Sequence, residues 1–209
     1  MRLVRVLSIC LAVLLGVACS ENEFEDDSDK ELAERHADDG WSSFSAGDFS
    51  TAVRHFEDAL VIDPYNAQAT IGAGWAWLKM GSESVARQYF KQSFLLEGAG
   101  PDGYVGLGVT MFDGNRDSCY LLFDQVLALD SHWTFDKGVV YHDYRDMHIL
   151  RALGLFYQAN FDSAKTTLQF ADPDYEPSWD VSREEKIDEL IRKFKELQDA
   201  RSGAAFGMY

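Results

Sequence analysis

The sequence has few cysteines, few basic residues and no familiar catalytic motif, and each shortage excludes a class of protein. Three cysteines in 209 residues are too few for a fold held together by disulfides. Lysine and arginine number 19 against 35 acidic residues, which gives a formal net charge of −16. This balance argues against nucleic acid as a partner, because phosphate backbones are bound by basic side chains. No Gly-x-Ser-x-Gly motif or phosphate-binding glycine loop occurs, and we expect no enzymatic activity and no cofactor.

The hydrophobic run at the N-terminus is too short to be a stable membrane anchor. It covers residues 6–17, whereas a helix that spans a bilayer needs about twenty apolar residues. Arg2 and Arg5 precede the run and small residues follow it, which is the layout of a secretory signal peptide. We therefore expect a cleaved leader.

The end of this leader, Leu15-Gly16-Val17-Ala18-Cys19, resembles a bacterial lipoprotein signal. The resemblance implies that residues 1–18 are removed and that Cys19 becomes an acylated first residue, carrying palmitate and related chains. Two or three such chains anchor a protein stably. Ser20 after the cysteine indicates the outer membrane of the cell envelope, at its periplasmic face or at the cell surface. The alternative is cleavage after Ser20, which discards Cys19 and releases a soluble protein.

An acidic segment follows the cysteine. Residues 20–39 contain ten Asp or Glu against Lys30 and Arg35. Like charges at this density repel one another and favour an extended chain. We interpret residues 19–32 as a tether that holds the folded part away from the membrane; the alternative is a signal for export to the cell surface.

Four columns of residues then recur with a period of 33 or 34. They are Gly40, Gly74 and Gly108; Gly47, Gly81 and Gly114; Ala52, Ala86 and Cys119; Phe56, Phe90 and Phe123. This period and residue order resemble the tetratricopeptide repeat (TPR), a helix–turn–helix unit that stacks into a solenoid. The resemblance implies that the first glycine column and the small third column allow two helices to approach, and that the aromatic column fills the gap between repeats.

The predicted fold is therefore all-α, an α–α superhelix of three to four helical hairpins with a C-terminal capping helix. We assign repeats to residues 33–66, 67–100, 101–131 and 147–173, with an aromatic insertion at 132–146. The fourth repeat is looser, with Gly154 in the glycine position and a turn about two residues shorter. Residues 174–209 form the capping helix and a tail, beginning with a capping box of Ser182 and Glu185. An alternative role for the apolar face of this helix is to recruit a partner helix.

The resemblance also implies where a partner binds, because certain positions of the first helix of each TPR line a concave groove. The positions carried over to this sequence are apolar: Trp41, Phe44, Ile71, Trp75, Leu78, Val105, Val109 and Phe112. Exposed apolar patches of this size mark interaction sites. The insertion at 132–146 or the N-terminal segment is an alternative occupant, since either could fold back and fill the groove.

These observations favour a noncatalytic scaffold or adaptor that binds another envelope protein or peptide. The alternative is a binding protein for a small apolar ligand or lipid, held in a pocket closed by the 132–146 insertion. We expect no metal site: His142, Asp143, Asp146 and His148 stand close in sequence, but their spacing matches no strong ligand pattern.

Overall fold

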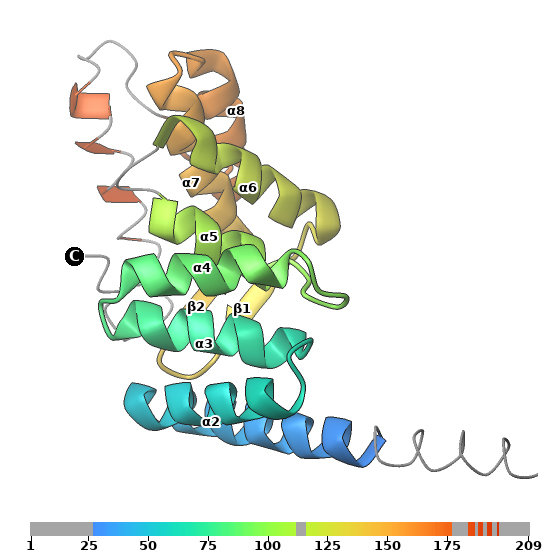
Figure 1. Ribbon diagram of the computed structural model, residues 1–209. Helices are drawn as coiled ribbons and strands as arrows, with labels where there is room; N and C mark the ends of the chain where they lie inside the picture. Colours follow the sequence, from blue (N-terminus) through green and yellow to red (C-terminus); the bar gives the residue numbers. More distant parts are fainter. Residues whose placement is uncertain are drawn as a thin grey trace, which may run out of the picture.

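The computed structural model describes residues 27–111, 116–176, 184–186, 188–189, 192–193 and 196. Cys19, the predicted site of acylation, and Phe112, a predicted groove residue, lie outside these residues. The chain begins with a helix over 27–45, called the first helix below. The helices that follow are α2 (Phe49–Ile62), α3 (Ala67–Lys79), α4 (Glu83–Ser93), α5 (Asp102–Met111), α6 (Arg116–Leu129), α7 (Tyr144–Tyr157) and α8 (Phe161–Ala171). They pair as antiparallel hairpins that stack one on the next (Figure 1).

The first helix includes residues 27–32, the last six of the predicted tether. Residues 27–32 are helical but exposed, and burial begins at Ala33 and Ala37, which are 0% and 2% exposed. No helix among the described residues is both long enough and apolar enough to cross a membrane.

Three-residue turns join the two helices of the first, second and fourth hairpins. Asp48 and Asn160 close two of these turns as N-caps, each accepting a hydrogen bond from a backbone N–H of the next helix. The middle residue of each turn has a left-handed backbone: Gly47 (φ 81°), Gly81 (φ 78°) and Ala159 (φ 61°). The fourth turn therefore has the same length as the others, and the expectation of a turn two residues shorter is wrong.

Aligning the fourth hairpin on this turn also changes which residue matches the first glycine column. Gly40 and Gly74 each lie seven residues before the turn glycine, and the residue seven before Ala159 is Ala152. Gly154, which the sequence suggested for this place, faces the Cβ of Tyr120 on α6 instead. The matching aromatic position holds Leu168, a smaller side chain that is 1% exposed.

Phe56 and Phe90 each lie between two glycines from neighbouring hairpins. A Cβ added at Gly40 or Gly72 would come within 2.6 or 2.3 Å of the Phe56 ring. Phe90 has the same surroundings, because a Cβ at Gly74 or Gly106 would come within 2.7 or 2.2 Å of it. The second glycines of the two pairs, Gly72 and Gly106, are also 34 residues apart and so form a further position that recurs with the repeat period. The 34-residue period therefore reflects the way in which one buried phenylalanine ring packs between successive hairpins.

The insertion between α6 and α7 forms a small β-hairpin. Its strands are β1 (Thr134–Asp136) and β2 (Tyr141–Asp143), antiparallel and paired with Phe135 opposite His142. Gly138, with φ 72°, lies in the turn between them. Phe135 and His142 are buried, whereas Thr134 is exposed, which is the alternation expected of a strand with one covered face. The sequence predicts an insertion here, and the two strands within it were not predicted.

The C-terminal segment contacts the last hairpin. The described residues 184–186, 188–189, 192–193 and 196 are helical. The Tyr175 hydroxyl donates a hydrogen bond to Glu189 at 2.6 Å, and the Lys193 ammonium lies 2.6 Å from the Asp172 carboxylate. These contacts join the segment to the residues that follow α8. Ser182 and the predicted apolar face (Ile187, Leu190, Ile191, Phe194, Leu197) lie outside the described residues.

Candidate functional site: the concave face

The predicted groove residues lie on the first helix, α3 and α5, and most of them are buried. Trp41 is 9% exposed and Trp75 is 1% exposed. Phe44, Ile71 and Val105 are at 0%, and Leu78 and Val109 are half-buried. The structure therefore brings these side chains to one face of the stack, where other parts of the chain cover them.

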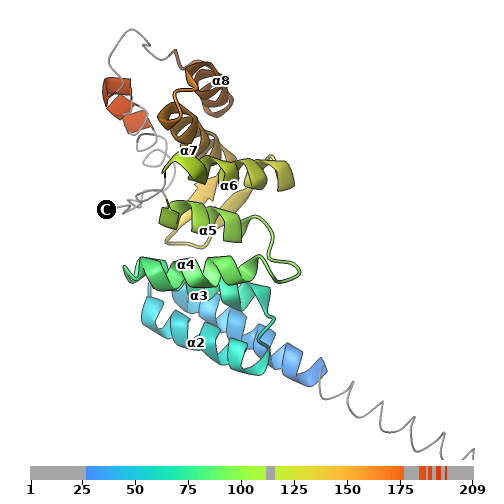
Figure 2. The same ribbon diagram turned by 45° about the horizontal axis from the view of Figure 1, so that its top comes forward.

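The β-hairpin provides much of this cover. Figure 2 shows its strands lying against the stacked helices. The Phe135 ring stacks on Trp75, with centroids 4.8 Å apart and planes 27° apart, and meets Trp41 edge-on at 5.9 Å. The Lys137 ammonium lies 4.5 Å from the centroid of the Trp41 ring, a cation–π contact. An extended segment of the chain itself thus packs directly against the two tryptophans.

Polar contacts hold the first strand of the hairpin in place. The Trp133 indole, 2% exposed, donates a hydrogen bond from Nε1 to the Asp102 carboxylate at 2.7 Å. Burial raises the pKa of Asp102 above its ordinary value, while this hydrogen bond and the nearby Lys137 ammonium act in the opposite direction. Asp102 on α5 is therefore a point at which the start of the β-hairpin is held against the helices.

The second strand is held where it runs into α7. The Asp143 side chain accepts a hydrogen bond from the Arg145 backbone N–H. It also accepts one from the Asp146 backbone N–H, while the Asp146 carboxylate accepts one from the Asp143 backbone N–H, and this reciprocal pair is a capping box. His142 Nδ1 lies 3.3 Å from the Asp146 carboxylate, and both side chains are fully buried. The acidic residues of this stretch therefore serve to start α7 and to orient His142.

His148 belongs to a different environment from His142. Its ring stacks on Phe170 of α8, with centroids 5.2 Å apart and planes 16° apart. Burial, together with the nearby Arg151 guanidinium, lowers the pKa of His148 to about 4, so the ring is neutral at pH 7. The two histidines of the stretch thus have separate packing partners.

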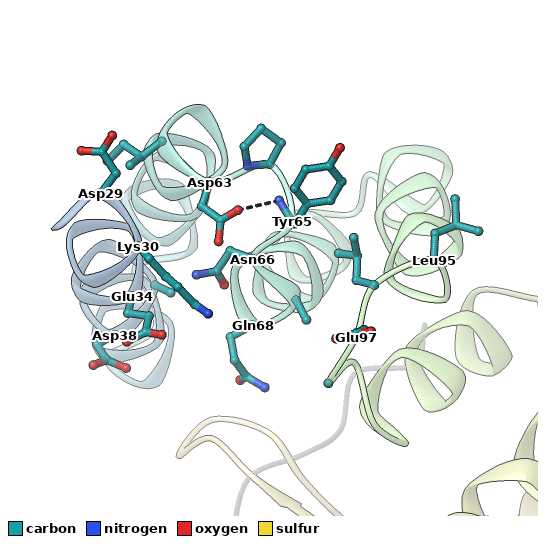
Figure 3. Close-up of a pocket in the computed structure, with 16 residues that line it drawn as sticks. Asp29, Lys30, Glu34, Asp38, Asp63, Tyr65, Asn66, Gln68, Leu95 and Glu97 are labelled. Atoms are coloured by element: carbon teal, nitrogen blue, oxygen red, sulfur yellow. Dashed lines mark hydrogen bonds between the residues drawn. The ribbon is translucent and has the colours of Figure 1, made fainter. Parts of the chain in front are cut away.

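An open cleft lies beside the covered groove (Figure 3). Its volume is about 980 Å³. It is lined by residues of the first helix between 29 and 38, by residues 62–68 from the end of α2 to the start of α3, and by residues 95–98 after α4. Five carboxylates and one ammonium line it: Asp29, Glu34, Asp38, Asp63, Glu97 and Lys30. Ala37 also lines it, and because Ala37 lies one helical turn before Trp41 on the same face of the first helix, the cleft is next to the first-helix side of the groove.

Two large apolar side chains stand at the same cleft. Tyr65 is 79% exposed and Leu95 is 85% exposed. The Asp63 carboxylate accepts a hydrogen bond from the Tyr65 backbone at 2.9 Å, which fixes the loop that carries the ring. Next to it, Asn66 caps α3 through the Ala69 backbone at 2.8 Å. The cleft therefore combines negative charge with exposed apolar surface.

No sequence pattern predicted the cleft residues as a site. The loops that carry Tyr65 and Leu95 lie outside the helix positions that line a TPR groove, and only the folded chain brings them beside the first helix. The acidic excess of residues 20–39 was a partial signal, because Asp29, Glu34 and Asp38 belong to it. We interpreted the beginning of that excess as a tether rather than as one wall of a site.

Solved structures of other proteins resemble this fold. MamA is 19% identical, with 78% of this chain and 96% of that chain covered and a TM-score of 0.53. A mutant of MamA is 18% identical, with 86% and 95% covered and a TM-score of 0.56. TTC0263, a thermophilic TPR protein in Thermus thermophilus, is 17% identical, with 80% and 86% covered and a TM-score of 0.53. The sequence matches no family model and no curated protein.

These similarities concern the fold alone, because the identities are low. They confirm the predicted class: the chain is a stack of helical hairpins with TPR-like architecture. The β-hairpin is a small addition to this all-α framework.

Proposed function

We propose that this chain is a noncatalytic scaffold of the bacterial cell envelope that binds another protein through its concave face. The observation that carries the proposal is that this face already holds an extended segment, the β-hairpin, against Trp41 and Trp75. Stacked helical hairpins form extended concave surfaces of the kind that bind polypeptides. We prefer this function to a pocket for a small apolar ligand because hairpin side chains pack directly on both tryptophans.

The open cleft next to this face is the surface that we assign to the partner. Its carboxylates attract cations, and the Tyr65 and Leu95 side chains offer apolar surface that a partner would bury. We therefore propose a partner segment that carries lysine or arginine together with one or more apolar side chains. The net charge of −16 favours the encounter with such a segment at low ionic strength.

Photo-crosslinking in intact cells tests this assignment. A photoreactive residue at Tyr65 or Leu95 is expected to capture one envelope protein through a peptide that contains basic residues. Gln88, exposed on α4 and absent from the cleft lining, is the matched control position and is expected to capture no such peptide.

Charge reversal separates a specific adduct from a chance one. With the crosslinker at Tyr65, Glu34→Lys combined with Asp38→Lys is expected to reduce the adduct at least tenfold, whereas Glu34→Gln with Asp38→Asn should reduce it less. Equal yields from Tyr65 and Gln88, or an adduct that charge reversal leaves unchanged, would show that the cleft is not the partner site.

We further propose that the chain is attached to the outer membrane through acyl chains on Cys19. The support is the sequence around Cys19, which directly follows the predicted leader of residues 1–18. Metabolic labelling with a clickable palmitate analogue is expected to label the wild-type chain, and Cys19→Ala is expected to lose all label and leave the membrane fraction. Cys119→Ala is the control, because buried Cys119 occupies a position held by alanine in two other repeats. An unlabelled wild-type chain that begins at Glu21 would instead establish cleavage after Ser20.

A further inference from the structure

Two histidines and an aspartate lie close together on the two helices of the first repeat. His36 lies on the first helix, and His55 and Asp58 lie on α2. One ligand atom from each of the three residues lies within 4.8 Å of the other two. None of the three lines the acidic cleft, so this cluster is a separate feature.

The local helix geometry explains why these side chains meet. His55 and Asp58 are three residues apart on α2 and therefore share one face of that helix. The antiparallel first helix presents His36 to the same face, with the His36 and His55 ring centroids 6.1 Å apart and their planes at 34°. The close packing of Gly40 on Phe56 fixes the approach of the two helices just beside the cluster.

The two imidazole rings have coordination capacity that the described part of the chain does not use. The Nδ1 atoms of His36 and His55 are shielded from solvent and make no hydrogen bond to any described residue. A neutral imidazole has one nitrogen that donates and one that accepts, and a buried nitrogen without a partner is unfavourable. A metal ion coordinated by one nitrogen of each ring would hold the two rings in a fixed position relative to each other.

We propose that His36, His55 and Asp58 form a binding site for a divalent transition-metal ion of the zinc class. Two imidazole nitrogens and a carboxylate oxygen are a ligand set that suits Zn²⁺, and three protein ligands leave a fourth position for solvent or another ligand. Imidazole favours Zn²⁺, Ni²⁺ and Cu²⁺ over Ca²⁺ and Mg²⁺. Asp58 is exposed and both rings are half-buried, which gives the ion a path from solvent.

Binding requires only local adjustment of the side chains. Ligand atoms around a tetrahedral Zn²⁺ lie about 3.3 Å apart, given metal–ligand distances near 2.0–2.1 Å. The distances between the three ligand atoms, which are now up to 4.8 Å, therefore have to shorten by about 1.5 Å. Rotation of the exposed Asp58 side chain and small movements of the rings can supply this change. Since the ligands come from two helices, the bound ion would clip the first helix to α2 and stabilise the first repeat.

Calorimetric titration of the purified full chain with Zn²⁺ tests this site. We expect one tight site, with affinity reduced at least tenfold in His36→Ala and in His55→Ala and less in Asp58→Asn. His132→Ala is the matched control, because His132 is exposed and lies outside the cluster. It should bind as the wild type does. Ca²⁺ and Mg²⁺ should not compete for the site.

A second readout does not depend on the folding of the variants. Co²⁺ added to the wild-type chain is expected to give the visible absorption of a tetrahedral site and to broaden the ring resonances of His36 and His55. A wild-type chain that binds Zn²⁺ no more tightly than the His36→Ala, His55→Ala double variant would overturn the proposal. So would broadening of other histidines in place of these two.

Discussion

Phe90→Ala is expected to lower the free energy of unfolding by about 3–5 kcal/mol, the range for removing a fully buried phenylalanine. Phe90 is 0% exposed and its ring fills the space between Gly74 of its own hairpin and Gly106 of the next. Removing the ring therefore opens a cavity between two repeats. Chemical denaturation followed by circular dichroism measures the change. Phe170→Ala is the matched control, because that phenylalanine is 63% exposed, and we expect it to lose less than about 1 kcal/mol.

The fourth repeat suggests two substitutions, at Gly74 and Phe90, whose effects on stability should partly cancel each other. Alanine alone at Gly74 would bring a Cβ within 2.7 Å of the Phe90 ring, and overpacking of this kind costs about 1–3 kcal/mol. The fourth repeat has Ala152 and Leu168 in the two matching positions. Gly74→Ala combined with Phe90→Leu should therefore lose at least about 1 kcal/mol less than the sum of the single changes. Additive losses would contradict the packing that we infer for the repeat period.

Phe135→Ala is expected to detach the β-hairpin from the concave face. The ring contacts Trp75, Trp41 and Trp133, and Phe135 is 2% exposed. Its removal should cost about 3–5 kcal/mol if the hairpin stays in place, and less if the hairpin leaves and the chain relaxes. In the second case Trp41 and Trp75 become exposed. Tryptophan emission should then shift to longer wavelength, and acrylamide quenching should increase.

Thr134→Ala is the control for this change, because Thr134 is the exposed neighbour of Phe135 in the same strand. We expect its emission and stability to match the wild type within about 0.5 kcal/mol. If Phe135→Ala kept both the wild-type stability and the wild-type emission, the hairpin would not be the cover of the two tryptophans.

The helical framework was predictable because its packing rule acts at fixed sequence positions. One aromatic ring recurs at the same position in the first three hairpins, so Phe56 and Phe90 could be recognised from spacing alone. The fourth repeat was harder to place because Ala159 takes the left-handed turn position usually held by glycine. Gly154 then offered a misleading match two residues away from the correct register.

The concave face was predictable only in part. The resemblance named Trp41 and Trp75 as groove residues, and the structure places them on one face, but their exposure depends on long-range contacts of the insertion. The strands of that insertion are three residues each, too short for a clear alternating pattern. The cleft arises where two inter-repeat loops meet the first helix, and no local pattern links these segments before the chain folds.

The most direct test of the account is whether the hairpin occupies the concave face in solution. Nuclear Overhauser effects between the Phe135 ring and the Trp75 indole, in a sample labelled selectively on phenylalanine and tryptophan, report this contact. We expect strong effects, because the two ring centroids are 4.8 Å apart. Absence of these effects, with hairpin resonances at random-coil positions, would show that the groove is open. The partner site would then have to be sought at Trp41 and Trp75 rather than in the acidic cleft.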